Sequence, residues 1–412
     1  MAPSHSSPGC IGRYRLVRRL GYSGTAEAFE ARAEGAAGIV KRVCVERIHP
    51  ALAADPTFVH HFTAEAQAAM ALSHGNLAQV FDFGQAGGVL YLAMELVDGP
   101  SLSEVHLALR RLGLALPPAY AAHILVAVCK GLHYIHTLTD AAGRPRGWTH
   151  RDVRPQTIRL SYEGQVKLVD FGIAAAAARC DAGDGAVLSE RRAYLAPECA
   201  AGVAANARTD VFAAGAVLYE LLAGTLPPAT GRLEPDGSAF GGAWPPLNEI
   251  APWVDPKLAE IVDRAVAPLP AARWPGALDL QQALATWCAE QGAWTTDEEL
   301  GALLRWLFAA RLQEAGRTTE VAGAPPARLL EWKAAFHAAS RRHTGRRPRL
   351  RRALPLVGVI LAAVAAAASL LVWSVRRPVA DRTVRVLSQP AGAAVFVDGR
   401  DTHATTPALL PG

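Results

Sequence analysis

Residues 150–174 of the 412-residue chain read HRDVRPQTIRLSYEGQVKLVDFGIA. The stretch begins with His150-Arg151-Asp152 and holds Asp170-Phe171-Gly172 near its end, and Ala196-Pro197-Glu198 follows it. Each of these triplets occurs by chance in unrelated proteins. Their order and spacing together form a specific combination that points to one fold.

The combination resembles the protein kinase family, and the run VKLVDFGIA at 166–174 is similar to bacterial Ser/Thr kinases of the eukaryotic-like type. The resemblance runs from residue 13 to residue 287. It implies an α+β, bilobal protein kinase fold, in which an N-terminal lobe has a β-sheet and the αC helix, and the C-terminal lobe is helical. It also implies transfer of the ATP γ-phosphate to protein serine or threonine, with Mg²⁺ as the metal.

The resemblance assigns roles to the residues at the matching positions. Asp152 stands where the catalytic base orients the substrate hydroxyl, with Arg154 in the same loop, and Asp170 stands where a carboxylate binds Mg²⁺. Glu65 occupies the position of the αC glutamate. The remaining matching positions are those for the nucleotide, Gly21, Gly24, Ala28, Cys44, Met94 (the gatekeeper), Glu95 and Leu96, and the structural ones, Asp210 and the ion pair of Glu198 with Arg273.

The third strand departs from the family pattern at the position of its phosphate-binding lysine. The motif Val-Ala-x-Lys appears here as Val43-Cys44-Val45-Glu46. A lysine there bridges the α- and β-phosphates to the αC glutamate. Glu46 instead is expected to face Glu65 and the polyphosphate, where like charges cost on the order of a few kcal/mol.

Three more departures surround the nucleotide position. Thr157 replaces the asparagine that binds the second magnesium, and a threonine hydroxyl is a poorer ligand. Arg159 replaces the leucine under the adenine, so its guanidinium either turns away or intrudes on an apolar slot. The phosphate loop reads LGYSGTAEAF (20–29), in which Ser23 and Ala26 stand at glycine positions and Ala28 at a valine position. Gly24 preserves some freedom to turn, but the loop cradles phosphate less closely.

No other cation is an evident substitute for the missing ammonium. The chain has five lysines, at 41, 130, 167, 257 and 333, and none lies between residues 14 and 40. Lys41 and Arg42 come too early in the third strand to reach the cleft. Strand alternation turns Arg47 to the face opposite Glu46.

The activation segment runs from Asp170 to Glu198, and its hydroxyl-bearing residues are Ser189 and Tyr194. A phosphate on Ser189 could be received by Arg151, since charged clusters order such loops. The alternative is an unphosphorylated loop in an inactive protein.

The composition excludes a fibrous, disulfide-rich or purely secreted protein. Lys+Arg number 42 and Asp+Glu number 37, which gives a formal charge of +5. Half of the residues are hydrophobic, and six cysteines are scattered without a CxxC pair, so neither a zinc site nor a disulfide framework is indicated.

Residues 353–375 carry no charge, and 23 helical residues span roughly 34 Å, which is enough to cross a bilayer. Seven arginines lie at 341–352 and four at 376–385. The positive-inside rule then predicts a single-pass protein of the inner (plasma) membrane with the N-terminal 350 residues in the cytoplasm. A buried helix of a soluble domain is the alternative for the span.

Residues 295–340 are predicted to be helical, because Thr296 and Glu299 form a capping box before leucines at helical spacing. The tail from Val384 resembles about half of a PEGA module, with a hairpin turn at Asp398-Gly399. A disordered tail with one hairpin is the alternative. The domain organisation is therefore a flexible N-terminus (1–12), the kinase-like domain (13–287), a juxtamembrane helical region (288–340), a basic flank (341–352), the span (353–375) and an extracytoplasmic PEGA-like segment, expected to be truncated (376–412).

The departures favour a pseudokinase with weak or no ATP binding, a membrane-tethered scaffold or regulator of other signalling proteins or kinases. An active Ser/Thr kinase that uses ATP and Mg²⁺ is the alternative, supported by the intact Asp152, Asp170 and Arg151. A cytoplasmic domain that merely anchors an outer sensor has no specific support. No nucleic acid partner is expected. The helices at 295–340 and the alanine-rich span are candidate homodimer contacts.

Overall fold

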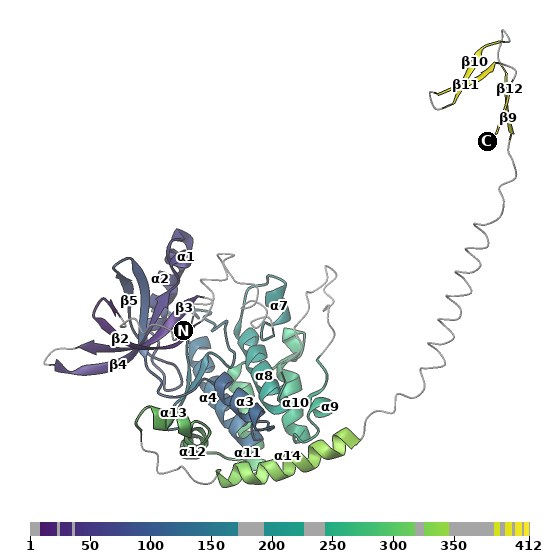
Figure 1. The fold of residues 1–412 in the computed structure, drawn as a ribbon. Helices are drawn as coiled ribbons and strands as arrows, with labels where there is room; N and C mark the ends of the chain where they lie inside the picture. Colours follow the sequence, from purple (N-terminus) through teal and green to yellow (C-terminus); the bar gives the residue numbers. More distant parts are fainter. Residues whose placement is uncertain are drawn as a thin grey trace. The chain divides into compact units, whose positions relative to one another are not determined.

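The computed structural model of the chain describes residues 9–22, 25–34, 38–171, 193–225, 244–317, 325–345, 383–387, 392–397, 400–405 and 408–411. The chain forms two compact units, Met1–Gly345 and Arg346–Gly412. The first unit has a β-rich lobe followed by a helical lobe, as Figure 1 shows. The predicted bilobal kinase fold is confirmed.

The N-terminal lobe is a six-stranded antiparallel sheet with the strand order β1-β2-β3-β4-β6-β5. Helix α2, which corresponds to the predicted αC helix, packs Phe58 and Phe62 against Leu92 and Met94 of the sheet. Asp55 caps this helix by accepting from the backbone N–H of Thr57 at 2.8 Å. The elements of this lobe are β1 (Cys10–Ile11), β2 (Tyr14–Tyr22), β3 (Ala26–Glu34), β4 (Val40–Ile48), α1 (Pro50–Ala53), α2 (Pro56–Met70), β5 (Val80–Ala86) and β6 (Val89–Glu95).

The predicted flexible start at 1–12 is wrong for its last residues. Strand β1 pairs with β2, with Ile11 opposite Tyr14. Both side chains are buried in a cluster with Tyr91, and this apolar contact holds the segment on the sheet.

The C-terminal lobe is built around α4 and α8, which contact each other and contribute many residues to its core. Every residue of α8 from Thr209 to Ala223 is buried, so this helix has no polar face and forms the centre of the lobe. The elements are α3 (Leu102–Arg111), α4 (Pro118–His136), β7 (Ile158–Leu160), β8 (Val166–Leu168), α7 (Pro197–Ala200), α8 (Ala207–Ala223), α9 (Leu247–Ile250), α10 (Pro256–Ala265), the short 3₁₀ helix η2 (Pro270–Ala272) and α11 (Ala277–Glu290).

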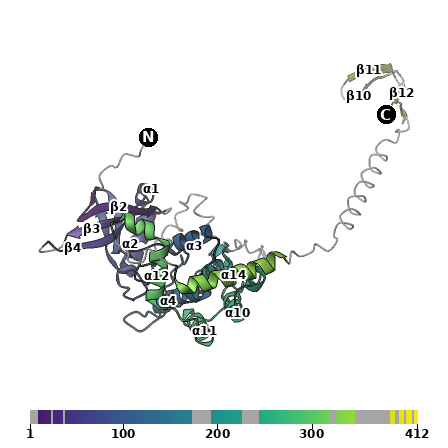
Figure 2. The same ribbon diagram turned by 60° about the horizontal axis from the view of Figure 1, so that its bottom comes forward.

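The predicted juxtamembrane helices belong to the core of the first unit. They are α12 (Asp297–Leu307), α13 (Ala309–Glu314) and α14 (Ala327–Gly345), and the predicted capping box of Thr296 with Glu299 is present. Leu300, Leu304 and Leu312 are fully or almost fully buried in the core of the helical lobe. Helix α14 lies along the same lobe in Figures 1 and 2. Its Trp332 Nε1 donates to the carbonyl of Ala115 at 3.0 Å. The compact unit therefore extends beyond the predicted boundary at residue 287.

The second unit has four short strands, β9 (Thr383–Val386), β10 (Ala394–Val397), β11 (Arg400–Thr405) and β12 (Ala408–Pro411). Strand β10 pairs with β11 across the predicted turn, with Val397 opposite Arg400, and β9 pairs with β12. In the described ranges, no helix has the length and apolar character required to span a bilayer. The predicted span at 353–375 and most of the basic flank at 341–352 lie outside those ranges.

Candidate active site

A cleft of about 360 Å³ lies where the two lobes meet, lined by residues of the sheet, of the hinge segment after β6 (Glu95–Gly99) and of the loops around β7 and β8. Most predicted nucleotide-contacting residues line it, namely Gly21, Ala28, Cys44, Met94, Glu95, Leu96 and Arg159, together with Glu46, Arg154 and Asp170. Gly24 lies outside the described residues. The strand register explains this grouping, because Glu46 lies opposite Ala28 on β3 and Leu92 on β6.

Glu46 and Asp170 both line this cleft, and their carboxyl groups lie close enough for each to shift the pKa of the other. Burial, the charge of Asp170 and the hydrogen bond to it hold the pKa of Glu46 well above its usual range. Burial also raises the pKa of Asp170, against the nearby Arg154 charge. Glu46 therefore binds a proton more tightly than an ordinary glutamate, and it supplies no positive charge at the lysine position.

The structure gives Glu65, which was expected to face Glu46, a cationic neighbour. Glu65 of α2 instead lies 3.8 Å from the Nη1 of Arg151, which also donates from Nε to Thr149 at 3.1 Å. A cation from the catalytic loop thus occupies the partner position that the resemblance gives to a lysine. Arg151 was also predicted to bind a phosphate carried by Ser189. Ser189 lies outside the described residues.

Glu46→Gln is expected to make the protein more stable than the wild type at pH 8 and similar to it near pH 4. An unfolded chain releases the Glu46 proton near its ordinary pKa of 4.5, whereas the folded chain retains it. The folded state then binds the extra proton, so wild-type stability falls by up to about 1.4 kcal/mol per pH unit above that value. Glutamine donates to Asp170 without this dependence. Denaturant unfolding across pH 4–8 measures the difference, and equal pH profiles for the two proteins would contradict it.

Side chains of the catalytic loop form hydrogen bonds with other residues of the same loop. Asp152 is 8% exposed and accepts from Arg154 Nε at 2.9 Å. Thr157 is fully buried, and its hydroxyl donates to the carbonyl of Asp152 at 2.6 Å and accepts from the Arg154 N–H at 3.2 Å. This hydroxyl turns to the loop backbone, as short polar side chains do, so Thr157 is not placed as a metal ligand.

Arg159 turns its guanidinium away from the apolar slot. Its Nη2 donates to the carbonyl of Gly99 at 2.6 Å, and its Nη1 lies 3.7 Å from Glu104. Glu104 also pairs with Arg311 of α13 at 2.8 Å, so the C-terminal extension contributes to the rim of the cleft. Sequence reasoning missed Glu104, although the capping box of Ser101 with Glu104 marks it as the third residue of α3.

None of the five lysines, all of which the structure describes, lines the cleft. Lys41 lies over the Phe81 ring at 3.5 Å, and Lys167 pairs with Glu95 of the hinge at 2.9 Å. Arg47 pairs with Glu27 on the other face of the sheet. The cations that line the cleft are Arg154 and Arg159 of the catalytic loop and β7.

Asp210 of α8 holds the turn of the catalytic loop. Its carboxylate is fully buried and accepts from the backbone N–H groups of His150 and Arg151 at 2.7 and 2.9 Å. Burial alone would raise the pKa of Asp210, but hydrogen bonds from His136 and this backbone hold it below its usual value. The turn places Arg151 at φ +67°, a left-handed conformation that a non-glycine residue adopts only when its surroundings compensate. Asp170 has a similar φ of +65°.

Glu198 and Arg273 form a buried ion pair below the cleft. The guanidinium binds both carboxylate oxygens, at 2.7 and 2.8 Å, and donates to the carbonyls of Ala267, Pro268 and Arg208. The pair links α7 to the segment before α11.

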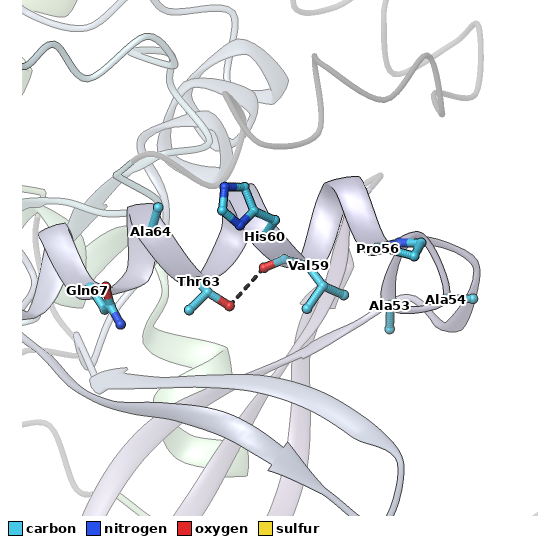
Figure 3. Close-up of a pocket in the computed structure, with 8 residues that line it drawn as sticks. All are labelled: Ala53, Ala54, Pro56, Val59, His60, Thr63, Ala64 and Gln67. Atoms are coloured by element: carbon cyan, nitrogen blue, oxygen red, sulfur yellow. Dashed lines mark hydrogen bonds between the residues drawn. The ribbon is translucent and has the colours of Figure 1, made fainter.

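A second hollow, of about 500 Å³, lies on the outer face of α1 and α2 (Figure 3). Its lining shares no residue with the cleft, and Thr63 there donates back to the carbonyl of Val59 at 2.8 Å. The lining consists of Ala53, Ala54, Pro56, Val59, His60, Thr63, Ala64 and Gln67. It holds one titratable side chain, His60, and no group placed for chemistry.

Comparison with known proteins shows the family to which this architecture belongs. The family model for the protein kinase domain matches residues 14–238, more than half of the chain. The chain belongs to the protein kinase family. Relatives in this family include a protein of Myxococcus xanthus (strain DK1622) named tyrosine-protein kinase MasK, which is 35% identical over 298 residues, 72% of this chain and 46% of that protein.

Serine/threonine-protein kinase PknB of Mycobacterium leprae (strain TN) is 36% identical over 225 residues, 53% of this chain and 34% of that protein. The chain thus spans less than half of the length of these curated relatives. Among solved structures, the kinase domain of Mycobacterium tuberculosis PknI is 28% identical, with a TM-score of 0.54 over 69% of this chain and 99% of that one. These similarities make the chain a bacterial protein kinase of the eukaryotic-like type.

Kinases of this family normally use ATP and Mg²⁺, and the cleft of this kinase domain does not fit that pair. A glutamate whose pKa is held well above its usual range stands where an ammonium would meet the phosphates, beside the aspartate that would bind the metal. The hydroxyl at the second metal position is buried against the backbone. Within the described residues, no group of three or more histidine, cysteine or acidic side chains could hold a metal ion.

Proposed function

We propose that this chain is a membrane-anchored pseudokinase of bacterial signalling, with weak or no ATP binding and phosphotransfer, that acts as a scaffold or regulator. The observation that carries the proposal is the meeting of the Glu46 and Asp170 carboxyl groups in the cleft. Glu46 puts a carboxyl group at the position where the family has an ammonium. The same carboxyl group interacts with the aspartate that would bind the metal. The inward hydroxyl of Thr157 supports the same conclusion.

A scaffold needs a stable fold rather than turnover, and the chain retains what stabilises a kinase fold. The ion pair of Glu198 with Arg273 and the Asp210 contacts to the catalytic loop keep that loop in place. The partners would be other signalling proteins or kinases, with a homodimer as one arrangement.

The membrane part of the proposal rests on the sequence. The uncharged residues 353–375 follow seven arginines and supply the inner-membrane anchor, with the kinase domain in the cytoplasm. The paired strands β9–β12 support a PEGA-like segment outside. This orientation predicts that protease added to intact spheroplasts cleaves the tail. A tail that is protected until the membrane is permeabilised would contradict it.

An active protein kinase is the second candidate, because Asp152 and Asp170 are present and Asp210 holds the backbone of the catalytic loop at Arg151. Its acceptor would be protein serine or threonine, as in the name of PknB, or tyrosine, as in that of MasK.

Phosphotransfer by the full-length chain separates the two candidates. We expect no transfer from γ-labelled Mg-ATP to the chain itself or to a generic protein substrate above the level of Asp152→Asn, the matched variant without the catalytic carboxylate. The readout includes serine, threonine and tyrosine. Transfer by the wild type that Asp152→Asn abolishes would establish the active kinase instead.

A further inference from the structure

A pocket of about 260 Å³ lies on the hinge segment, next to the nucleotide cleft. This hinge pocket shares Leu20, Leu96, Val97 and Arg159 with the cleft. Its other walls include residues of the segment 311–317 in the C-terminal extension (α12–α14), none of which lines the cleft. The extension therefore completes a separate pocket, which the motifs of a kinase domain do not predict.

Four arginines from separate parts of the chain line the hinge pocket. They are Arg18 of β2, Arg159 of β7, and Arg311 and Arg317 of the extension. Their side chains are between 23% and 51% exposed, so a dissolved ion can reach them. The carboxylates in the same lining are Asp98 and Glu314. Cations thus outnumber anions in the lining, and this favours a negatively charged ligand.

The arginines of the extension have carboxylate partners that leave part of each guanidinium free. Arg317 Nη1 donates to Asp98 at 2.9 Å, and Arg311 Nη1 donates to Glu104 at 2.8 Å. Within the described residues, Nε and Nη2 of both side chains donate to no other protein group. An arginine has five N–H donors, and partly exposed ion pairs of this kind are weak. A doubly charged ligand can therefore bind the free edges of both guanidiniums.

Tyr162 adds a hydroxyl group without a partner to the same pocket. The residue lines the pocket and is 5% exposed, and its buried hydroxyl has no hydrogen-bond partner within the described residues. The guanidinium of Arg317 lies over the Tyr162 ring, 5.5 Å from its centroid. A buried hydroxyl without a partner is costly. An anion that enters between the ring and the guanidinium would accept from both.

The remaining walls of the hinge pocket are apolar. Leu20 of β2, Leu96 and Val97 of the hinge, and Leu312 and Ala315 of the extension line it. Apolar walls with a few polar groups are typical of sites for small organic molecules. The pocket therefore suits an anionic group that carries a small apolar part, rather than a bare inorganic ion.

We propose that the hinge pocket binds a small organic phosphate monoester, with the phosphate group held by Arg311, Arg317 and the hydroxyl of Tyr162. A phosphate monoester has three terminal oxygens and nearly two negative charges at pH 7, and the guanidinium fork matches this geometry. A carboxylate has one charge fewer and competes less well with Asp98 and Glu104. The proposal involves neither Glu46 nor Asp170, so it holds whether or not the cleft binds a nucleotide.

The test is calorimetric titration of the full-length chain in detergent at about pH 7.5 with three probes: phenyl phosphate, benzoate and inorganic phosphate. Phenyl phosphate is a dianion at this pH. We expect it to bind saturably and at least about tenfold more tightly than benzoate, because it has the second charge and the third oxygen. It should also bind at least about tenfold more tightly than inorganic phosphate, because its ring buries against the apolar walls.

Three variants locate the bound phosphate. Tyr162→Phe should weaken phenyl phosphate binding by about tenfold but should not lower the thermal unfolding midpoint of the free protein, because the hydroxyl loses no partner there. Arg317→Gln should weaken binding by at least about tenfold. Arg328→Gln is the matched control, since it removes the same charge from the extension at a partly exposed side chain outside the pocket. Its affinity should stay within about twofold of the wild type.

Three results would overturn this inference, and each leaves the pseudokinase proposal standing. The first is the absence of saturable phenyl phosphate binding. The second is equal affinity for phenyl phosphate and benzoate, which would show attraction to positive charge without recognition of phosphate. The third is wild-type affinity in both Tyr162→Phe and Arg317→Gln, or an equal loss in Arg328→Gln, which would place the probe outside the hinge pocket.

Discussion

The double substitution Glu46→Lys with Thr157→Asn is expected to raise the affinity of the chain for Mg-ATP by about 100-fold. The first change removes the carboxyl group bonded to Asp170 and supplies an ammonium for the α- and β-phosphates, and the second restores an amide oxygen for a metal. Like-charge repulsion of a few kcal/mol becomes attraction, and about 2.7 kcal/mol corresponds to 100-fold. Calorimetric titration of the full-length double variant measures the gain.

Glu46→Gln is the control for this gain. It removes the ionisable group without adding a cation, so its Mg-ATP affinity should lie much closer to that of the wild type. If the double variant bound no better than Glu46→Gln, the residue at the lysine position would not be what prevents nucleotide binding.

Arg273→Ala is expected to cost about 3–5 kcal/mol in the free energy of unfolding. Arg273 is 1% exposed, and its removal leaves the buried carboxylate of Glu198 without a counter-charge and the carbonyls of Ala267 and Pro268 without donors. Denaturant unfolding followed by tryptophan fluorescence checks the loss.

Arg144→Ala is the matched control, because its side chain is 80% exposed in the ion pair with Asp140. Exposed pairs contribute little, so a loss of about 0.5 kcal/mol or less is expected. Similar losses in the two variants would show that the buried pair does not hold the lower lobe.

The motifs of residues 150–174 were sufficient to predict the bilobal fold, because their order reflects one chain topology. The residue types also showed which nucleotide-contacting positions depart from the family pattern. Strand alternation placed Glu46 in the cleft and Arg47 outside it, and the register of β4 agrees.

The contacts made by the residues that differ from the family pattern could not be predicted in the same way. The contact of Glu46 with Asp170 joins residues 124 positions apart, and Asp170 has a φ of +65°, which is uncommon for a non-glycine residue. The contact of Glu65 with Arg151 joins segments 86 positions apart. The guanidinium of Arg159 was expected either to turn away from the apolar adenine slot or to intrude on it. It turns away, because the carbonyl of Gly99 and the carboxylate of Glu104 bind it.

Isothermal titration of the full-length wild-type chain with Mg-ATP measures directly whether the carboxyl pair keeps the nucleotide out. The pairing of Glu46 with Asp170 predicts no saturable binding at nucleotide concentrations up to about 1 mM, equivalent to less than about 4 kcal/mol of binding free energy. Saturable, Mg²⁺-dependent binding with a dissociation constant near about 10 μM would contradict it.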